Sequence, residues 1–473
     1  MIKTKQFKTQ PIAFIPRGKK VHFTGIKGIG ISALAQFFAG AGAKVTGSDG
    51  KEKFPADAAL KRLKIPINSF SPKNINPSLD LIIYSSAYNQ NHPEIKKAIE
   101  LKIPLKSYGE ALAEIFNGGK NKIVVAGSHG KTTTTALLGH LLDKTGYQPT
   151  VFVGGVSNNW QGNFKKGGNE WLVTEGDEYQ KKFLFLKPDY LLITNIDFDH
   201  PDCFKDKKEY RQAFEELKKQ ARKKIFVGRK ISSSFREFLT RIDFSLLGEK
   251  NKENAFLVYR LAKELKIPDE KIKKAFETFK GVKRRMECVK RQASGVKFQA
   301  PCFMIYDDYA HHPEEIKATL AALKEKYPDY KIVAFFQPHT FSRTKTLLKE
   351  FGECFKKADF VYLLPTFASA RESGSRNSTL LRNKSLTNGQ GGRVFTTREQ
   401  KPKENTDKLL LEEVSKYHRN VKSLPFNFKL LSSEINELLN SVPAGHLPKG
   451  DKFIILSMGA GDVYKLTEKL NLL

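Results

Sequence analysis

Residues 123–135 read Ile-Val-Val-Ala-Gly-Ser-His-Gly-Lys-Thr-Thr-Thr-Thr, and they constrain the fold more than any other part of the 473-residue chain. An apolar run, a glycine turn, a lysine and then hydroxyl side chains predict a strand, a tight loop and the start of a helix. In such a loop, backbone N–H groups face the phosphates of a nucleoside triphosphate, the lysine reaches the β- and γ-phosphates, and a hydroxyl binds Mg²⁺. The predicted ATP-binding positions are Gly127, Ser128, His129, Gly130, Lys131, Thr132 and Thr133.

A second glycine-rich turn, Gly25–Gly30, follows a short apolar strand near the start of the chain. Together with Asp49, 19 residues after Gly30, it also fits the turn that binds a dinucleotide such as NAD. Lys27 adds a positive charge that favours any diphosphate, and a turn without a ligand is the third possibility. Two phosphate-binding turns indicate two nucleotides, one of them a candidate substrate. The predicted ligand-binding positions are Gly25, Lys27, Gly28, Ile29, Gly30 and Asp49.

Strand-like and helix-like segments alternate along the chain, which is typical of parallel α/β domains. At roughly 150 residues per domain, the length predicts about three domains. A glycine-containing linker and a later basic segment predict limits at 1–118, 119–285 and 286–473. Residues 374–408 are poor in apolar side chains, so we expect a polar insertion there in the third domain.

The chain is strongly basic, because 81 lysines and arginines outnumber 50 aspartates and glutamates and give a net charge of +31. This excess favours anionic partners such as nucleotides, nucleic acids or an acidic surface. The basic residues are spread along the chain, a pattern more typical of a solvated surface than of a nucleic-acid groove. A nucleic-acid-binding P-loop ATPase is therefore only a remote alternative, and we expect no nucleic-acid partner.

Cysteine usage and hydropathy predict a cytoplasmic protein. The four cysteines show neither metal-ligand spacing nor a disulfide pattern, which fits reduced thiols. No apolar run approaches the roughly 18 residues of a membrane-spanning helix, and the first residues do not resemble a signal peptide. We therefore expect no membrane insertion, while the oligomeric state is not predicted.

Two acidic segments, Glu175–Glu178 and Asn195–Pro201, follow apolar strands of the second block. Ligands of open α/β sheets bind beyond the carboxyl ends of strands, so both segments are expected near the triphosphate loop. Because Mg²⁺ prefers oxygen ligands, Glu175 and the hydroxyl of Thr132 are candidate ligands, with His200 as a second metal or water-positioning group. Charge neutralisation by this ion is what phosphoryl transfer requires. The alternative for Glu175 is a surface residue at a strand end.

Histidines and an arginine follow two strand-like segments in the last third of the chain. His311 lies in the segment Asp307–Pro313, and Arg343 ends the segment Phe336–Arg343. An arginine binds a carboxylate through two hydrogen bonds, so Arg343 is a candidate for holding an acidic group. The alternative for both residues is a structural or solvated position at the start of a helix.

Taken together, these motifs resemble the Mur ligase family, from about Val21 to the C-terminus. A single motif is weak, whereas the ordered set is specific. The resemblance rests on Gly25–Gly30, Gly127–Thr134, Glu175–Glu178, Thr194–Pro201, Gly248–Asn254, Asp307–Pro313, Phe336–Arg343, Ser369–Glu372 and Met458–Asp462.

The resemblance implies a Rossmann-like N-terminal domain for a UDP-linked substrate, a central P-loop ATPase domain and a Rossmann-like C-terminal domain that presents an amino acid. It is closest to the branch that joins L-alanine to UDP-N-acetylmuramate in peptidoglycan synthesis. There the substrate carboxylate attacks the γ-phosphate of ATP, and the amine then attacks the acyl phosphate to give an amide, ADP and phosphate. A branch that attaches a ready-made tripeptide is the alternative. A dehydrogenase is disfavoured, because hydride transfer needs no triphosphate site.

The resemblance also implies roles for individual residues. Lys131 and Thr132 serve the ATP phosphates and the metal, while Glu175 and His200 form the magnesium pair. The remaining implied positions are Asn251 and Asn254 for adenine or ribose, Tyr309, His311 and Arg343 for the amino acid and the acyl phosphate, and Ser85 and Ser86 near the uridine.

Three positions depart from the family pattern. Gly176 replaces the usual alanine of the segment Glu175–Glu178, which is a mild change. Lys27 stands where glycine is usual, which either adds charge at the diphosphate or narrows the turn. Thr340 stands where some members carry arginine, which leaves more of the carboxylate binding to Arg343.

Overall fold

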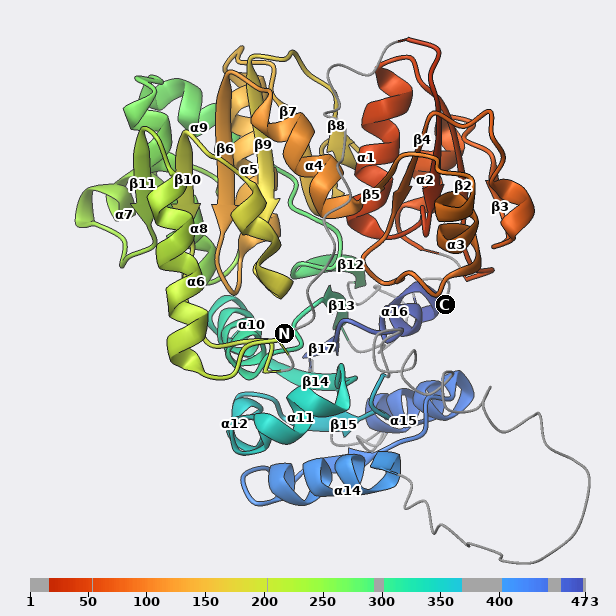
Figure 1. Ribbon diagram of the computed structural model, residues 1–473. Coiled ribbons are helices and arrows are strands. Elements are labelled where there is room, and N and C mark those ends of the chain that lie inside the picture. Colours follow the sequence, from red (N-terminus) through yellow and green to blue (C-terminus); the bar gives the residue numbers. More distant parts are fainter. Residues whose placement is uncertain are drawn as a thin grey trace, which may run out of the picture. The chain divides into compact units, whose positions relative to one another are not determined.

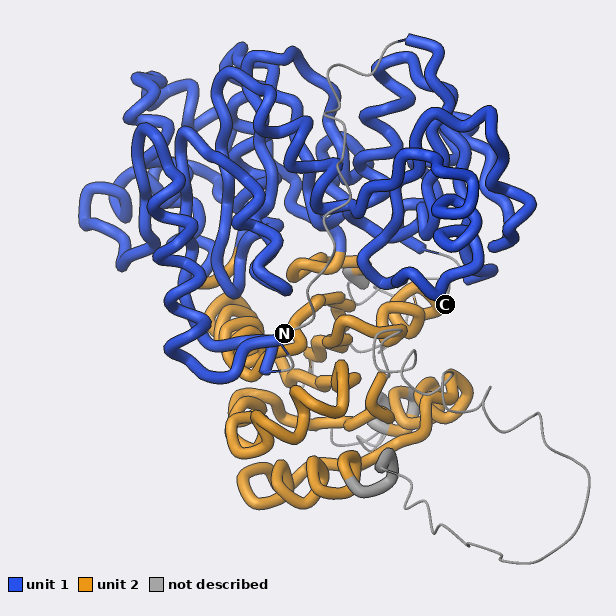
Figure 2. The backbone as a smooth tube through the Cα atoms, viewed as in Figure 1, with its two compact units in different colours: residues 1–246, 250–283 blue, residues 247–249, 284–473 orange. Residues whose placement is uncertain are grey.

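The computed structural model describes residues 17–52, 54–201, 203–292, 302–367, 402–440 and 452–470. Contacts divide the chain into two compact units, residues 1–246 with 250–283 and residues 247–249 with 284–473 (Figure 2). The described residues form three sheets, two in the first unit and one in the second (Figure 1). The expected α/β fold class is confirmed, and each predicted domain contains one sheet. The predicted domain limits themselves stay a prediction.

The first sheet is parallel and has the strand order β3-β2-β1-β4-β5. Its central strand β1 (Lys20–Thr24) buries Val21 and Phe23. The chain leaves β1 toward β2 on one side and later returns to β4 on the other side. Ligands bind where the strand order reverses in this way, so the Gly25–Gly30 turn after β1 lies at the expected place. The other elements are α1 (Ile29–Gly40), β2 (Lys44–Ser48), α2 (Asp57–Arg62), β3 (Ile67–Asn68), η1 (Pro72–Asn74), β4 (Leu81–Tyr84), α3 (Pro93–Glu100), β5 (Leu105–Ser107) and α4 (Tyr108–Asn117).

The second sheet has the order β11-β10-β6-β9-β7-β8 and is parallel except for the antiparallel pair β7–β8. Its strand β6 (Asn121–Ala126) buries an unbroken apolar run, as a strand covered on both faces does. The remaining elements are α5 (Lys131–Lys144), β7 (Thr150–Ser157), β8 (Gly162–Lys165), β9 (Trp171–Gly176), η2 (Tyr179–Phe185), β10 (Tyr190–Ile193), α6 (Lys207–Gln220), β11 (Lys224–Val227), α7 (Ser233–Thr240), α8 (Glu249–Glu264) and α9 (Asp269–Glu277).

The β7–β8 hairpin of the second sheet packs against α1 of the first sheet (Figure 1). Phe152 and Phe164 of the hairpin lie 5.8 and 6.2 Å, between ring centroids, from Phe37 of α1. Phe152 is fully part of the apolar core of the first sheet. The hairpin therefore joins the two sheets of the first unit through buried apolar contacts.

The third sheet, in the second unit, has the order β12-β13-β17-β14-β15-β16. β12 is antiparallel to β13, and the other neighbours are parallel. Its elements are β12 (Glu287–Gln292), β13 (Cys302–Asp308), α10 (Pro313–Lys326), β14 (Tyr330–Phe336), α11 (Phe341–Thr346), α12 (Leu348–Cys354), β15 (Phe360–Leu363), α14 (Pro402–Ser415), β16 (Val421–Ser423), α15 (Phe428–Asn440), β17 (Lys452–Met458) and α16 (Tyr464–Leu470).

Most of the insertion predicted at 374–408 lies outside the described residues, up to residue 401. Its last part begins helix α14. Across the described parts of the chain, no helix is both long enough and apolar enough to cross a membrane.

Candidate active site

The predicted triphosphate loop lies between β6 and α5. Strand β6 ends at Ala126, and α5 begins at Lys131. Gly130 before the helix has a φ of +81°, and a Cβ there would lie 2.7 Å from Nδ2 of Asn254. Only glycine meets both conditions without strain. The first N–H groups of α5 thus follow a tight turn, the arrangement that binds phosphate.

The amine of Lys131, the first residue of α5, contacts the loop that precedes the helix. Its Nζ donates to the carbonyl oxygens of Gly127 at 2.5 Å and Ser128 at 3.1 Å. The same amine lies 2.8 Å from Oε2 of Glu178. Burial alone would lower the pKa of Lys131, but Glu178, together with Asp177 and Glu175, outweighs burial and raises it. The lysine is therefore charged at neutral pH, as phosphate binding requires.

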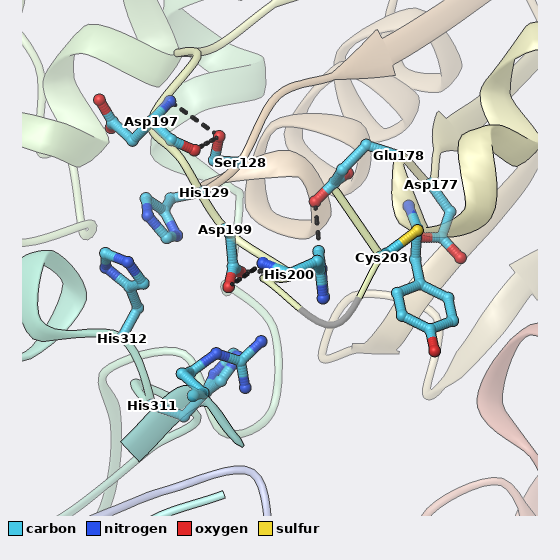
Figure 3. A network of polar contacts seen from close by, with 12 residues as sticks. Ser128, His129, Asp177, Glu178, Asp197, Asp199, His200, Cys203, His311 and His312 are labelled. Carbon is cyan, nitrogen blue, oxygen red and sulfur yellow. Dashed lines mark hydrogen bonds and ion pairs between the residues drawn. The ribbon is translucent and has the colours of Figure 1, made fainter. Parts of the chain in front are cut away.

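Glu178 connects Lys131 with His200. Its side chain is 1% exposed, and its Oε1 lies 3.5 Å from Nε2 of His200. The ring also lies 3.7 Å from the carboxylate of Asp199 (Figure 3). Sequence reasoning selected Glu175 from this acidic segment and missed Glu178. The available signal was proximity in the sequence, since Glu175 lies near the end of β9 and Glu178 follows that strand by two residues.

Thr132 and Glu175 lie together at the first turn of α5. The Thr132 hydroxyl donates to Oε2 of Glu175 at 3.0 Å, and the N–H of Gly154 donates to Oε1. One hydroxyl and one carboxylate suit Mg²⁺, which binds few protein oxygens and completes its shell with water and phosphate. No described group of three or more His, Cys, Asp or Glu side chains forms a metal site by itself. His200 lies 3.5 Å from Glu178, which pairs with Lys131, so the pairing of His200 with Glu175 at a magnesium ion stays a prediction.

The segment after β10 is hydrogen-bonded to the loop between β6 and α5. The N–H of Asp197 donates to the Ser128 hydroxyl at 2.9 Å, and the N–H of His129 donates to Oδ1 of Asn195 at 3.0 Å. Thr133 is buried in the first turn of α5. The structure therefore brings the Asn195–Pro201 segment to the loop, as the sequence predicted.

The two asparagines expected near the nucleoside lie on α8. Asn254 is buried and its amide group lies against Gly130. Asn251 lies about one helical turn earlier on the same helix. The structure thus places Asn254 beside the phosphate loop, and the contact of either residue with adenine or ribose stays a prediction.

Asp49 holds the first glycine turn through backbone hydrogen bonds. Its carboxylate accepts from the N–H groups of Lys27 and Gly50, each at 2.7 Å. Burial raises the pKa of Asp49, although these two N–H groups act in the opposite direction. The amine of Lys27 donates to the carbonyl oxygens of Gly50 and Glu52 at 2.8 and 2.9 Å. Lys27 therefore ties the turn to the following loop.

The other predicted residues of this region surround the turn. Ser85 and Ser86 follow β4, and a Cβ on Gly25 would lie 3.0 Å from Cβ of Ser85. On the other side, a Cβ on Gly30 would lie 2.7 Å from Cζ of Tyr108. Glycine at position 30 therefore permits the close approach of this ring. Gly28 and Ile29 complete the turn at the start of α1.

In the second unit, Tyr309 and His311 lie side by side. Their ring centroids are 5.3 Å apart, and Nδ1 of His311 lies 3.0 Å from the Tyr309 carbonyl oxygen. The guanidinium groups of Arg284 and Arg285 lie 5.1 and 4.8 Å from the centroid of the Tyr309 ring. Arginines stack on aromatic rings in this way, so two positive charges lie beside the Tyr309 ring.

Arg343 lies near His311, with the ring of His339 next to both residues. It is 5% exposed, and its Nη1 lies 3.4 Å from Nδ1 of His339. The ring of His339 is 5.9 Å from that of His311, measured between centroids. Thr340 has a φ of +68°, unusual for a β-branched residue. The structure thus brings together the three predicted residues of this unit. His339, which belongs to the predicted segment Phe336–Arg343 but was assigned no role, lies next to both Arg343 and His311.

Three family models match successive parts of the chain. They are the Mur ligase family, catalytic domain, at residues 20–120, the Mur ligase middle domain at 125–259, and the Mur ligase, glutamate ligase domain, at 284–414.

Curated relatives match along nearly the whole chain. The UDP-N-acetylmuramate--L-alanine ligase of Desulfitobacterium hafniense (strain Y51) is 36% identical over 491 residues, covering 95% of this chain and 99% of the relative. The protein of the same name from Clostridium kluyveri is 34% identical over 96% of this chain and 98% of its own length.

Solved structures share the fold. The UDP-N-acetylmuramate-alanine ligase of Thermotoga maritima superposes with a TM-score of 0.71 at 24% identity, covering 96% of this chain and 99% of that one. A murein peptide ligase from Psychrobacter arcticus superposes with a TM-score of 0.62 at 19% identity, covering 96% and 98%.

Proposed function

Because the chain belongs to the Mur ligase family, we propose that it joins L-alanine to UDP-N-acetylmuramate at the expense of ATP, in the synthesis of peptidoglycan precursors. The relatives that carry this name are 33–38% identical, which supports the choice of amino acid. The single structural observation that supports it best is the presence of two phosphate-binding turns in one compact unit. A ligase of this kind needs one turn for ATP and one for the UDP diphosphate.

ATP binds with its phosphates at the loop before α5 in this proposal. Lys131 neutralises charge on the β- and γ-phosphates, and Glu178 keeps the lysine charged and in place. Thr132 and Glu175 hold Mg²⁺, which neutralises further phosphate charge when bound. His200, fixed by Glu178 and Asp199, orients groups at the edge of this site.

The chemistry proceeds in two steps. A carboxylate oxygen of UDP-N-acetylmuramate forms a bond to the γ-phosphorus, and the bond to the β–γ bridging oxygen breaks to release ADP. The amine of L-alanine then forms a bond to the acyl carbon, loses a proton, and phosphate leaves. Positioning and charge neutralisation dominate such phosphoryl transfer. We assign Tyr309, His311 and Arg343 to the binding of the amino acid and the acyl phosphate, because a carboxylate suits Arg343.

Both proposed nucleotide substrates are metabolites of the cytoplasm, which supports a cytoplasmic location.

The test of the proposed function is phosphate release from ATP and Mg²⁺ with UDP-N-acetylmuramate, with and without L-alanine. Release that requires both substrates is the expected result. Release with L-alanyl-γ-D-glutamyl-meso-diaminopimelate in place of L-alanine would assign the chain to tripeptide attachment. No release with either acceptor would overturn the proposed function.

A further inference from the structure

Lys182 joins the surroundings of the two phosphate-binding turns. Its Nζ donates to the Ser86 hydroxyl at 3.1 Å and lies 3.3 Å from Oδ2 of Asp177. Ser86 follows β4 of the first sheet, whereas Asp177 follows β9 of the second. The side chain is only 12% exposed, and its amine lies 5.1 Å from the centroid of the Tyr179 ring. A half-buried amine with these partners is not an ordinary surface lysine.

Asp177 links Lys182 electrostatically to the ATP loop. Its burial works to raise its pKa, but Lys182 and Lys131 outweigh burial and lower it. The carboxylate of Asp177 therefore stays ionised, in contact with Lys182 and under the electrostatic influence of Lys131. Polar contacts thus lead from Ser86 through Lys182 to Asp177, and Asp177 interacts electrostatically with Lys131.

Tyr108 lies along the same path. The tip of its ring occupies the space beside Gly30 in the first turn. Burial raises the pKa of its hydroxyl, and Asp177 and Glu175 raise it further. The ring thus lies close to the first turn and within electrostatic range of the acidic residues at the second. Ser86, Tyr108, Asp177 and Lys182 together form what we call the connecting cluster.

This inference rests on the proposed function, in which one substrate must extend from the first turn to the second. The diphosphate of the UDP-linked acid lies at the first turn while its carboxylate reaches the γ-phosphate beside Lys131. The sugar acid must therefore pass the connecting cluster. Glu175, Asp177 and Glu178 would repel an approaching carboxylate. This repulsion is stronger in a partly buried site than in water, because the dielectric constant is lower there.

We propose that Lys182 binds the carboxylate of the UDP-linked sugar acid and thereby determines that an acid, rather than a neutral sugar, is accepted. In its position between Ser86 and Asp177, the amine offers a third hydrogen bond to an anion, because an ammonium group has three donors. Its positive charge offsets the repulsion from the neighbouring carboxylates. Lys182 is thus a specificity-determining residue for the acyl substrate.

The test compares Lys182→Met with Lys181→Met in the full-length protein. Both variants remove one positive charge from η2 and keep an unbranched side chain. Lys181 is 38% exposed and pairs with Glu209 at 3.0 Å, so it serves as the matched control. Loss of a charged hydrogen bond of typical strength predicts a rise in the KM for UDP-N-acetylmuramate of roughly tenfold or more in Lys182→Met. The KM for ATP is expected to change by less than about twofold. Lys182→Arg should restore part of the loss.

A second measurement separates carboxylate binding from a merely structural role. UDP-N-acetylglucosamine has the same nucleotide and a similar sugar but lacks the carboxylate. Its binding, measured by calorimetry or as competitive inhibition, should be unchanged in Lys182→Met, while binding of UDP-N-acetylmuramate weakens. Equal weakening of both ligands, or equal effects of Lys181→Met and Lys182→Met, would overturn the inference. The proposed function is judged separately, by whether the unmodified protein releases phosphate with both substrates.

Discussion

Nε2 of Gln36 donates a hydrogen bond of 2.7 Å to Oδ1 of Asn163, and this contact joins helix α1 of the first sheet to the β7–β8 hairpin of the second. The amide of Asn163 donates in turn to the Ser32 hydroxyl at 2.9 Å and to the carbonyl oxygen of Ile29. Ile29 belongs to the glycine turn itself. Asn163, fully buried on the second sheet, therefore helps to fix the turn that we assign to the UDP diphosphate.

Replacing Asn163 should weaken the first unit. Asn163→Ala leaves the buried amide of Gln36 with only the Ser32 carbonyl oxygen as acceptor and removes the hydrogen bonds that Asn163 donates, so we expect a loss of about 1–3 kcal/mol in the free energy of unfolding. Urea unfolding measures this loss. Lys166→Ala is the control, because Lys166 is exposed and donates to the Gly40 carbonyl oxygen at the other end of α1. We expect its effect to stay within about 0.5 kcal/mol. Equal losses in both variants would contradict a special role for Asn163.

The sequence predicted where both glycine turns lie, each between a strand and a helix, because such a turn depends on local spacing. Glycines, a lysine and hydroxyls within a few residues of a strand define such a turn without reference to the rest of the chain. Glu175 and Thr132 were expected to be neighbours, and the structure places them 3.0 Å apart. The carboxyl ends of parallel strands meet at one edge of a sheet, so this proximity also follows from topology.

Residues that act across the two sheets could not be predicted in the same way. Asn163 lies in a polar segment whose residues show no hydrophobic period, and only tertiary packing reveals what its amide contacts. Lys182 was one basic residue among many in a chain of net charge +31. Glu175 and Glu178 are two glutamates three positions apart, at the end of β9 and just after it, and only the fold shows that their partners differ.

Lys131→Ala should abolish turnover while binding of the UDP-linked substrate survives. In the proposed function, the amine neutralises the phosphates of ATP, whereas the UDP diphosphate binds at the other turn. We expect kcat to fall by at least about a hundredfold, the effect of removing a preorganised charge from a transition state. Calorimetry with UDP-N-acetylmuramate should give a dissociation constant within about twofold of that of the unmodified protein.

Loss of both activity and UDP-substrate binding would have a different meaning. It would show that Lys131, through Glu178, also supports the fold of the unit. Circular dichroism of the variant would then reveal a lowered unfolding temperature, and the assignment of the two turns to two nucleotides would lose this support.

Thr132→Val should raise the Mg²⁺ concentration that supports half-maximal activity. Valine has a similar shape but lacks the hydroxyl that lies 3.0 Å from Glu175. Loss of one ligand is expected to raise this concentration roughly tenfold, as loss of a supporting group at a metal site does. Thr132→Ser keeps the hydroxyl and should stay close to the unmodified protein. An unchanged Mg²⁺ requirement in Thr132→Val would exclude this hydroxyl as a ligand.

Glu94 is expected to make the stability of the first sheet depend on pH in the acid range. Its buried carboxylate accepts from the hydroxyls of Thr24 and Ser48, the N–H of Ser71 and the amide of Asn74. Burial alone would raise its pKa, but the hydrogen bonds, including one from His22, outweigh burial and lower it from 4.5 to about 2. A lowered pKa stabilises the folded state above the ordinary pKa, and this stabilisation is lost as the pH falls from 4.5 toward about 2.

Glu94→Gln removes this titration, so the variant and the unmodified protein should differ most at neutral pH. The shift corresponds to about 3 kcal/mol at pH 7, of which roughly 1 kcal/mol is lost by about pH 4 because the unfolded carboxylate begins to bind protons there. Urea unfolding at both pH values measures the change in the difference. Glu100→Gln on the same helix is the control, because Glu100 is 63% exposed and pairs only with Lys97 among the described ion pairs. If the gap between Glu94→Gln and the unmodified protein stays constant with pH, Glu94 does not titrate as the buried hydrogen bonds require.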